Sequence, residues 1–270
     1  MRTIAHLSDL HFGRVNPAIL QPLLTFILKA KPDLVAISGD LTQRARKEEF
    51  AAARKFLDAI PFAQIVVPGN HDVPLYNVLT RFMRRLDRFR CFISDDLAPF
   101  FSDEELAVAG VNTARALTFK DGRINATQIA WLRERFKNVR GGKLKIVVTH
   151  HPFDLPAGVE DGSVVGRARK AMKALAESRV DLFLAGHFHI GHTSSSTTRF
   201  RIPDYSALVV SSGTTTSTRS RGQANSFNLI HTDRSRVGVD RWEWQPESAQ
   251  FYCVSKETFD RTAEGWSAVR

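Results

Sequence analysis

The chain has 270 residues, 43% of them hydrophobic, and a formal net charge of +10. This composition allows a buried core, while no apolar run approaches the length of a membrane-spanning helix. Only two cysteines occur, Cys91 and Cys253, which argues against a disulfide framework and predicts a reducing, cytoplasmic location. The positive charge favours an anionic partner, either a nucleotide, a nucleic acid or an anionic membrane surface. No familiar nucleic-acid-binding module is recognisable, so nucleic acid is possible but not favoured.

Up to about residue 185, short apolar segments alternate with amphipathic segments. Each apolar segment is bounded by polar or glycine-containing turns, which is typical of strands. The predicted strands span residues 3–8, 34–38, 64–67, 106–111, 144–149 and 181–185. Helices are predicted around residues 19–28 and 50–60, where apolar side chains recur on one face, and Thr42 is the predicted N-cap of the second. Because the chain opens directly on a strand, we expect no signal peptide.

Beyond residue 192 the sequence is rich in Ser, Thr and Gly, and its apolar segments indicate successive strands joined by turns. These predicted strands span residues 206–214, 226–233, 237–244 and 250–256. We expect the strands within 205–256 to complete a second sheet that packs on the first. The predicted fold is therefore α/β, a four-layer αββα sandwich of two mixed β-sheets flanked by helices, in a single domain over residues 1–270.

Polar residues gather at the C-terminal ends of the predicted strands. The blocks are SDLH with Asp9 and His11, SGD with Asp40, PGNHD with Asn70, His71 and Asp72, VVTHHP with His150 and His151, and AGHFH with His187 and His189. Parallel strands place these ends at one sheet edge, where open α/β sheets carry their active sites, so a single site is predicted. Carboxylate, imidazole and amide ligands together suit Mn, Fe or Zn. Seven such ligands exceed the need of one ion, which favours two divalent metal ions that share a carboxylate.

The set D-x-H, G-D, G-N-H-[DE], H and G-H-x-H resembles the calcineurin-like metallophosphoesterase superfamily, and most closely its cyclic nucleotide phosphodiesterase-like branch. All five blocks occur in the family's order. The resemblance implies that one metal is held by Asp9, His11, Asp40 and His189, and the other by Asp40, Asn70, His150 and His187. Asp40 would then bridge the two ions.

The same resemblance implies roles for the remaining motif residues. His71, beside Asn70, is expected to contact the substrate phosphate and to protonate the leaving oxygen, while Asp72 is expected to orient or tune His71. His151 is expected to neighbour the site and to contact substrate. The expected reaction is the hydrolysis of a nucleotide or cyclic nucleotide phosphodiester by a hydroxide held between the metals, without a covalent enzyme intermediate.

Three other functions stay open on the sequence alone. A hydrolase of a lipid-linked pyrophosphate or phosphodiester at a membrane surface is the first. A nuclease is the second, because related dinuclear sites cleave nucleic acids. A non-catalytic binding module is the third, although no ligand position is missing. The sequence does not indicate the oligomeric state.

An arginine-rich segment follows the PGNHD block, within residues 74–93, and predicts a helix over 78–90. Its apolar residues recur at helical spacing, and the other faces carry Arg81, Arg84, Arg85 and Arg88. A plain surface helix is the favoured interpretation. Because the segment begins only a few residues after His71, it could instead form a cap that contacts an extended anionic substrate or a lipid surface.

Three further polar residues have other expected roles. His6 lies inside the first predicted strand and is expected to be a packed or hydrogen-bonded core residue. Asn112 is expected to hydrogen-bond a neighbouring loop. His192 fits either the metal cleft or a turn near the substrate.

Overall fold

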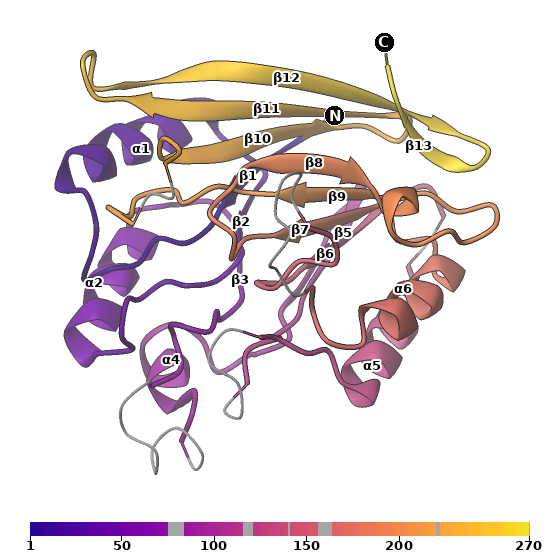
Figure 1. Cartoon of the computed structure of the whole chain (residues 1–270), viewed down its shortest axis with the longest axis horizontal. Helices are drawn as coiled ribbons and strands as arrows, with labels where there is room; N and C mark the ends of the chain where they lie inside the picture. Colours follow the sequence, from indigo (N-terminus) through magenta and orange to yellow (C-terminus); the bar gives the residue numbers. More distant parts are fainter. Residues whose placement is uncertain (75–83, 116–120, 140, 156–163, 220–221, 270) are drawn as a thin grey trace.

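The computed structural model describes residues 1–74, 84–115, 121–139, 141–155, 164–219 and 222–269. Two mixed β-sheets pack face to face, and helices cover both outer faces (Figure 1). The predicted αββα sandwich is therefore confirmed. Among the described residues, no helix combines the length and the apolar character needed to cross a membrane.

Seven strands form the first sheet, in the order β13-β12-β11-β10-β1-β2-β3. Their bounds are β1 (Arg2–Leu7), β2 (Leu34–Ile37), β3 (Gln64–Val66), β10 (Ser226–Thr232), β11 (Arg236–Gln245), β12 (Gln250–Thr262) and β13 (Gly265–Ala268). The strands β1, β2 and β3 are parallel, whereas β10 pairs antiparallel with β1. All four residues of β2 are buried, which explains its unbroken apolar run.

Six strands form the second sheet, in the order β4-β5-β6-β7-β9-β8. Their bounds are β4 (Phe100–Ser102), β5 (Leu106–Gly110), β6 (Leu144–Val148), β7 (Leu182–Ala185), β8 (His192–Ser195) and β9 (Leu208–Ser211). The inner four are parallel, and the edge strands β4 and β8 are antiparallel to their neighbours. Both edge strands were absent from the sequence prediction. β4 is only three residues long and β8 contains no aliphatic residue, so neither carries a strand pattern.

The helices divide between the two outer faces. α1 (Pro17–Ala30), α2 (Lys47–Asp58) and α4 (Asp87–Phe92) share a hydrophobic core with the outer face of the seven-stranded sheet. α5 (Ala126–Lys137) and α6 (Ala168–Glu177) share a second core with the six-stranded sheet, and Figure 1 shows them on the opposite side of the molecule. A third core fills the space between the sheets, with Ile4 and Ile146 fully buried in it. One short 3-10 turn, Ser196–Thr198, follows β8.

The N-terminus of α2 differs from the prediction. Thr42 is not its N-cap, because the helix begins at Lys47. The carboxylate of Glu49, the third residue of the helix, accepts the backbone N–H of the N-cap residue Arg46 at 3.2 Å, which is one half of a capping box. The hydroxyl of Thr42 instead accepts the backbone N–H of Ala45 at 3.2 Å within the preceding loop.

The six strands predicted before residue 186 are confirmed, but the C-terminal strands do not complete one second sheet. β9 joins β7, whereas β10, β11 and β12 extend the sheet that β1 begins. The cause is that β1 has a free edge opposite β2, and β10 pairs along it from Arg2 opposite Thr232 to His6 opposite Asn228. Each sheet therefore combines strands from both parts of the chain.

The segment within 74–93 is described only in part, because residues 75–83 lie outside the described residues. Of the predicted helix over 78–90, residues 84–90 are described. The described part contains α4, whose Phe89 is fully buried in the core beneath α2. Arg84 and Arg85 are exposed. The guanidinium of Arg88 donates to the carbonyl oxygen of Ala45 at 2.7 Å, which ties this segment to the loop before α2.

Candidate metal centre

The motif residues meet where the C-terminal ends of parallel strands from both sheets approach each other. β1, β2 and β3 lead to Asp9, Asp40 and Asn70, and β6 and β7 of the other sheet lead to His150 and His187. The prediction that the first three blocks share a sheet edge is confirmed by the parallel order of β1, β2 and β3. The site additionally requires the second sheet, because two of its histidine blocks follow β6 and β7.

Asp9, His11 and His189 form a first cluster. Oδ1 of Asp9 lies 3.6 Å from Nε2 of His11 and 3.5 Å from Nε2 of His189. All three side chains are buried. The rings of His11 and His189 are nearly parallel, at 7°, with centroids 5.2 Å apart. Three ligand atoms from two strand ends thus face one small volume.

Asn70, His150 and His187 form a second cluster. Oδ1 of Asn70 lies 3.0 Å from Nε2 of His150 and 3.1 Å from Nδ1 of His187, and these two nitrogens are 3.2 Å apart. The other nitrogen of His150, Nδ1, lies 2.8 Å from the carbonyl oxygen of Ser38. Because a carbonyl only accepts, His150 carries a proton on Nδ1, and Nε2 is the nitrogen that faces the cluster.

Asp40 lies between the two clusters. Its Oδ2 is 3.7 Å from Nε2 of His11 and 3.4 Å from Nε2 of His150. A single carboxylate oxygen therefore faces ligand atoms of both clusters. This is the position that a bridging carboxylate would need.

The spacing and the donor set fit divalent metal ions. Ligands about 2.1 Å from one ion, at angles between octahedral and tetrahedral, lie roughly 3.0 to 3.4 Å from each other. The second cluster has this spacing, and the first is a few tenths of an ångström wider. Oδ1 of Asp9 and Nε2 of His11 are buried without a hydrogen-bond partner among the described residues. Buried polar atoms need a partner, and a cation would supply one to both.

The protein fixes the second oxygen of each carboxylate. Oδ2 of Asp9 accepts from Ser8 Oγ at 2.6 Å and from the backbone N–H of His187 at 3.0 Å. Oδ1 of Asp40 accepts the backbone N–H of His71 at 2.8 Å. Each carboxylate is thereby oriented with its remaining oxygen toward the histidines.

The backbone at this centre is strained. Five of the seven candidate ligands adopt a positive φ, in the left-handed region that costs a residue with a side chain on the order of 1 to 3 kcal/mol. They are Asp9 (51°), His11 (49°), Asp40 (52°), His187 (78°) and His189 (61°). Such strain persists only where the surrounding structure imposes it, and it clusters at functional sites.

Two glycines allow the loops to approach the carboxylates. A Cβ at Gly69 would lie 2.1 Å from Oδ1 of Asp40, and a Cβ at Gly186 would lie 1.8 Å from the hydroxyl oxygen of Ser8. Any side chain at either position would displace a loop that carries ligands. The glycines of the PGNHD and AGHFH blocks therefore serve close packing of the motif loops.

The charges of the centre shift its pKa values strongly. Burial disfavours the charged form of Asp40, but His150 and His71 outweigh it and hold the pKa of that carboxyl well below its ordinary value. Burial also lowers the pKa of His150, but the charge of Asp40 raises it to about 9. The pKa of His187 falls to about 3, because burial and the charge of His150 oppose a second proton there. The carboxylates of Asp40 and Asp9 thus favour a positive charge on His150, in the second cluster. A metal ion bound there would supply that positive charge instead.

His71 lies at the rim of the centre. Its ring centroid is 4.9 Å from that of His11, and its Nδ1 is 2.9 Å from the carbonyl oxygen of Gln43. Nδ1 therefore donates to Gln43 and Nε2 is the nitrogen left for other partners. Nη1 of Arg219 lies 3.1 Å from this Nε2. Burial lowers the pKa of His71 below its ordinary value.

Asp72 hydrogen-bonds to neighbouring loops, and within the described part of the chain its carboxylate makes no hydrogen bond to the ring of His71. The pKa of its buried carboxyl is raised to about 6 by burial and by the charge of Asp40. Its oxygens accept from the backbone N–H groups of Leu41 (3.1 Å), Thr42 (2.8 Å) and Gly69 (2.9 Å), and from the Thr42 hydroxyl (2.8 Å). Asp72 therefore joins the loop of Asp40 to the loop of Asn70.

His151 is fully buried beside the second cluster. Its ring centroid lies 4.6 Å from that of His187, and its Nδ1 is 2.8 Å from the hydroxyl oxygen of Thr113. One nitrogen each of His150, His151 and His187 lie within 4.8 Å of one another. The predicted neighbour of the site is therefore in place.

The remaining polar predictions have clear outcomes. His6 is fully buried, with its Nε2 3.0 Å from the hydroxyl oxygen of Ser38, so its expected core position is confirmed. Oδ1 of Asn112 accepts the backbone N–H of Ala114 at 2.9 Å, a structural contact within its own loop and not to the neighbouring loop that was expected. His192 begins β8 and does not belong to the ligand groups found among the described residues.

The sequence prediction missed one component of the site, the segment 214–219. Thr214, Thr215 and Thr216 are buried, and Arg219 reaches His71. No spacing signal marks this segment, because a run of Ser, Thr and Gly reads as a surface turn. Its burial alone distinguishes it.

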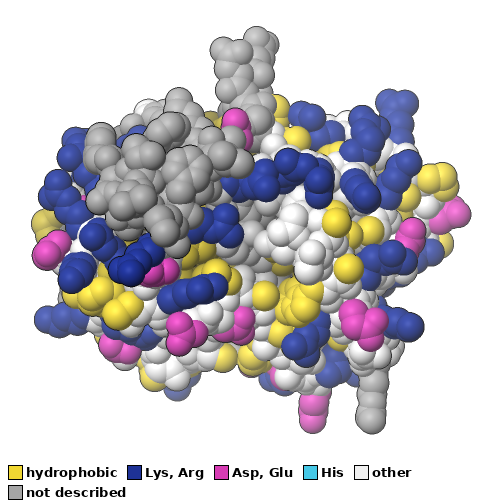
Figure 2. Space-filling model, turned by 90° about the horizontal axis from the view of Figure 1, so that it is seen from below, with side chains coloured by type: hydrophobic (Ala, Val, Ile, Leu, Met, Phe, Trp, Pro, Cys, Tyr) yellow, Lys and Arg dark blue, Asp and Glu magenta, His cyan; other side chains and the backbone are white. Residues whose placement is uncertain are grey.

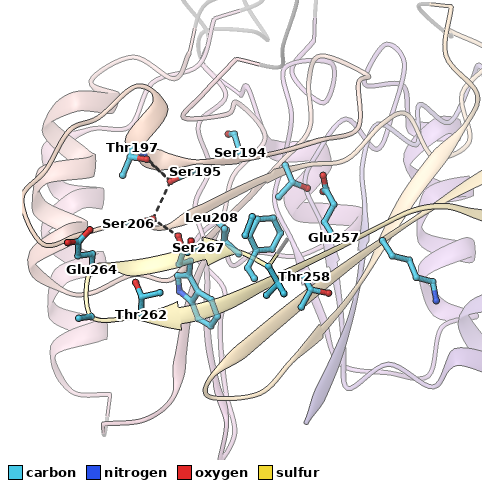
Figure 3. A pocket seen from close by; sticks show the side chains of 17 residues that line it. Ser194, Ser195, Thr197, Ser206, Leu208, Glu257, Thr258, Thr262, Glu264 and Ser267 are labelled. Atoms are coloured by element: carbon cyan, nitrogen blue, oxygen red, sulfur yellow. Dashed lines mark hydrogen bonds between the residues drawn. The ribbon is translucent and has the colours of Figure 1, made fainter.

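One surface pocket lies apart from the motif residues. A pocket of about 1130 Å³ is lined by hydroxyl-bearing residues of β8, β12 and β13 and contains none of the motif residues, and Figure 3 shows Ser195 and Ser206 joined by a hydrogen bond in it. The face seen in Figure 2 carries many more Lys and Arg than Asp and Glu side chains. The centre is thus defined by its ligands and not by the size of a cavity.

Comparisons with known proteins agree with this geometry. Glycerophosphodiester phosphodiesterase GpdQ of Enterobacter lignolyticus is 28% identical over 177 residues, which cover 57% of this chain and 58% of that protein. The chain therefore matches little more than half the length of this relative. A probable cyclic nucleotide phosphodiesterase of a Synechococcus species is 25% identical over 203 residues, which cover 69% of this chain and 73% of that protein.

Two solved structures share the fold. A dimetal phosphatase from Danio rerio superposes with a TM-score of 0.64 at 14% identity, covering 89% of this chain and 95% of that one. A purple acid phosphatase from yellow lupin gives a TM-score of 0.71 at 13% identity, covering 95% and 53%. The family model described as calcineurin-like phosphoesterase matches residues 2–191, which include every motif block from Asp9 to His189. The chain belongs to the calcineurin-like phosphoesterase family.

Proposed function

We propose that the chain is a two-metal phosphodiesterase that hydrolyses a nucleotide or cyclic nucleotide diester. The observation that carries the proposal is the position of Asp40, whose Oδ2 faces His11 at 3.7 Å and His150 at 3.4 Å. In this proposal one ion is held by the first cluster with Asp40, and the other by the second cluster with Asp40. The phosphodiesterase names of two relatives support a phosphodiester substrate, and the name of the Synechococcus relative supports a cyclic nucleotide.

The residues of the chain would divide the reaction among them. When bound, divalent cations supply positive charge to a phosphate and lower the pKa of water. Asn70 belongs to the second cluster and the ring of His71 borders the first, so a phosphate at the centre would meet an amide and an imidazole. The strained loops hold the candidate ligands before substrate arrives, which reduces the reorganisation needed in the reaction.

His71 is the proposed proton donor to the leaving oxygen. Its Nδ1 proton is engaged by Gln43, so the nitrogen that can deliver a proton is Nε2. Burial lowers the pKa of His71, whereas an anionic phosphate beside it would favour the protonated ring. Protonation at Nε2 would then depend on bound substrate, and delivery of that proton to an alkoxide leaves the neutral ring.

A substrate panel tests the proposal. Metal-reconstituted protein is assayed with cyclic nucleotides, dinucleotides, a glycerophosphodiester, a nucleotide-sugar lipid and phosphomonoesters. We expect a cyclic nucleotide or dinucleotide to give the highest kcat/KM without detergent. Turnover of the lipid alone, and only with detergent, would favour a membrane-surface hydrolase and contradict the proposal. Steeply salt-dependent DNA or RNA cleavage as the only activity would point to a nuclease instead.

A further inference from the structure

The segment Thr214–Thr218 runs beside the loop that carries Asp9 and His11. Three consecutive buried threonines hydrogen-bond to the backbone of that loop through their hydroxyls. The bonds join Thr214 Oγ1 to Asp9 O (2.9 Å), Thr215 Oγ1 to Ser8 N (3.0 Å) and Thr216 Oγ1 to Leu10 O (2.7 Å). The backbone N–H of Thr215 also donates to the carbonyl oxygen of Ser8 at 3.0 Å. The segment and the ligand loop therefore form one hydrogen-bonded unit.

The end of this segment is fixed as firmly as its beginning. The backbone N–H of Thr218 donates to the carbonyl oxygen of Arg14 at 2.8 Å. Asn225 holds the carbonyl oxygen of Ser217 at 2.8 Å, and the hydroxyl of Ser217 accepts the backbone N–H of Arg219 at 3.0 Å. The backbone that leads to Arg219 is thus held by Arg14 and Asn225. A side chain supported in this way starts from a defined position near the centre.

The guanidinium of Arg219 points to the rim of the centre. Its Nη1 lies 3.1 Å from Nε2 of His71, the nitrogen that Gln43 leaves available. A guanidinium has only donors, so Nε2 accepts from it. No carboxylate among the described residues lies within ion-pair distance of Arg219, so its charge is balanced by no partner in the described part of the chain. Two basic groups facing each other form an arrangement that an anion placed between them would stabilise.

We propose that Arg219 is a phosphate-binding residue, whose guanidinium turns from His71 to the non-bridging oxygens of a phosphoester. This step would leave Nε2 of His71 facing the bound phosphoester. Arginine suits the task because its planar fork can donate two parallel N–H groups to phosphate oxygens. The inference rests on the proposed function in one respect only, namely that the centre accepts a phosphate. Arg219 lies beyond the part of the chain that the family model matches.

The test compares Arg219→Gln, Arg219→Lys and a charge-matched control, Arg169→Gln, an exposed arginine of α6. The readouts are the dissociation constant of inorganic phosphate by calorimetry, metal content, and KM and kcat on a small diester. We expect Arg219→Gln to weaken phosphate binding and raise KM about 10- to 100-fold, the usual worth of hydrogen bonds to a charged group. Arg219→Lys should be intermediate, Arg169→Gln should match the parent, and all variants should retain their metals.

Three results would overturn the inference. They are phosphate binding by Arg219→Gln within about twofold of the parent, loss of metal in that variant, and absence of phosphate binding by the parent itself. Failure of the proposed function gives a different pattern. If the parent binds phosphate but hydrolyses no substrate of the panel, the phosphodiesterase proposal fails. The dissociation constants of phosphate for the parent and for Arg219→Gln then still decide the role of Arg219.

Discussion

The two ligand clusters differ in how completely the protein arranges them. In the second cluster, Asn70, His150 and His187 bring three ligand atoms within 3.0 to 3.2 Å of one another. In the first, Oδ1 of Asp9 lies 3.6 Å from Nε2 of His11 and 3.5 Å from Nε2 of His189. Nδ1 of His150, the nitrogen that points away from the cluster, donates to the carbonyl oxygen of Ser38, whereas Nδ1 of His11 has no hydrogen-bond partner among the described residues.

This difference indicates unequal affinity for metal. A ligand set that is already close and held by outer hydrogen bonds needs less rearrangement to bind an ion. We therefore expect the second cluster to bind its ion more tightly than the first. Asp40 faces both clusters, so its removal should weaken metal binding at both and abolish the difference in affinity between them.

The largest expected effect follows the change Asp40→Asn. If both ions share the carboxylate of Asp40, this change takes a negatively charged ligand away from each of them. Both ions should therefore be lost on dialysis, and activity should fall about 10³-fold or more. Elemental analysis of the purified protein measures the metals, and Asp95→Asn, an exposed carboxylate before β4, is the matched control. Two tightly held ions in Asp40→Asn would show that this residue does not bridge.

The next effect concerns His71, which borders the first cluster. His71→Ala should keep both metals and lose about 10²- to 10⁴-fold in turnover of an alkyl diester, the usual contribution of a general acid. A nitrophenolate leaves without protonation, so the loss on a nitrophenyl diester should be much smaller. Equal losses on both substrates would make His71 a phosphate-binding residue only.

A paired removal of ligands tests the inequality of the clusters directly. His11→Ala should retain one tightly bound ion, whereas Asn70→Ala should retain one weakly bound ion. Removing a residue that only hydrogen-bonds to a metal ligand lowers metal affinity about 10- to 100-fold. Removing a ligand itself should lower the affinity of its cluster by more than that. Calorimetric titration of the two metal-depleted variants gives both constants. If Asn70→Ala keeps the tighter ion, the order of the clusters is reversed.

The smallest effect is on stability and involves His6, which lies beneath the centre. Burial lowers its pKa to about 3, so the folded chain leaves it neutral while the unfolded chain protonates it below about pH 6.5. The free energy of unfolding should therefore decrease as the pH falls from 6.5 toward 3, by about 2 kcal/mol at pH 5 from this group alone. Denaturant unfolding of His6→Asn should show a shallower decrease, and an unchanged pH dependence would contradict the assignment.

The sequence predicted the strands well, and it placed the candidate ligands at the strand ends, because both are local patterns. A buried strand such as β2 is a short apolar run, and Asp40 follows it directly. The distribution of strands between sheets was not predictable in this way. β10 pairs with β1 although more than two hundred residues separate them, and the sequence of neither strand indicates which strand it pairs with.

The contacts of the loops were also hidden from the sequence. Asp72 was expected to orient its neighbour His71, yet its carboxylate reaches the backbone of Leu41 and Thr42. Arg219 meets His71 because the buried threonines before it follow the ligand loop. Both outcomes depend on how loops approach one another in space, which neither hydrophobic period nor motif spacing encodes.

The most direct test of the shared centre is a crystal structure of the manganese-loaded protein with anomalous diffraction. The account predicts two anomalous peaks, one at each cluster, both within about 2.2 Å of a carboxylate oxygen of Asp40. The peak in the second cluster should have the higher occupancy at limiting metal. A single peak, or two peaks of which only one contacts Asp40, would contradict a bridged two-metal centre.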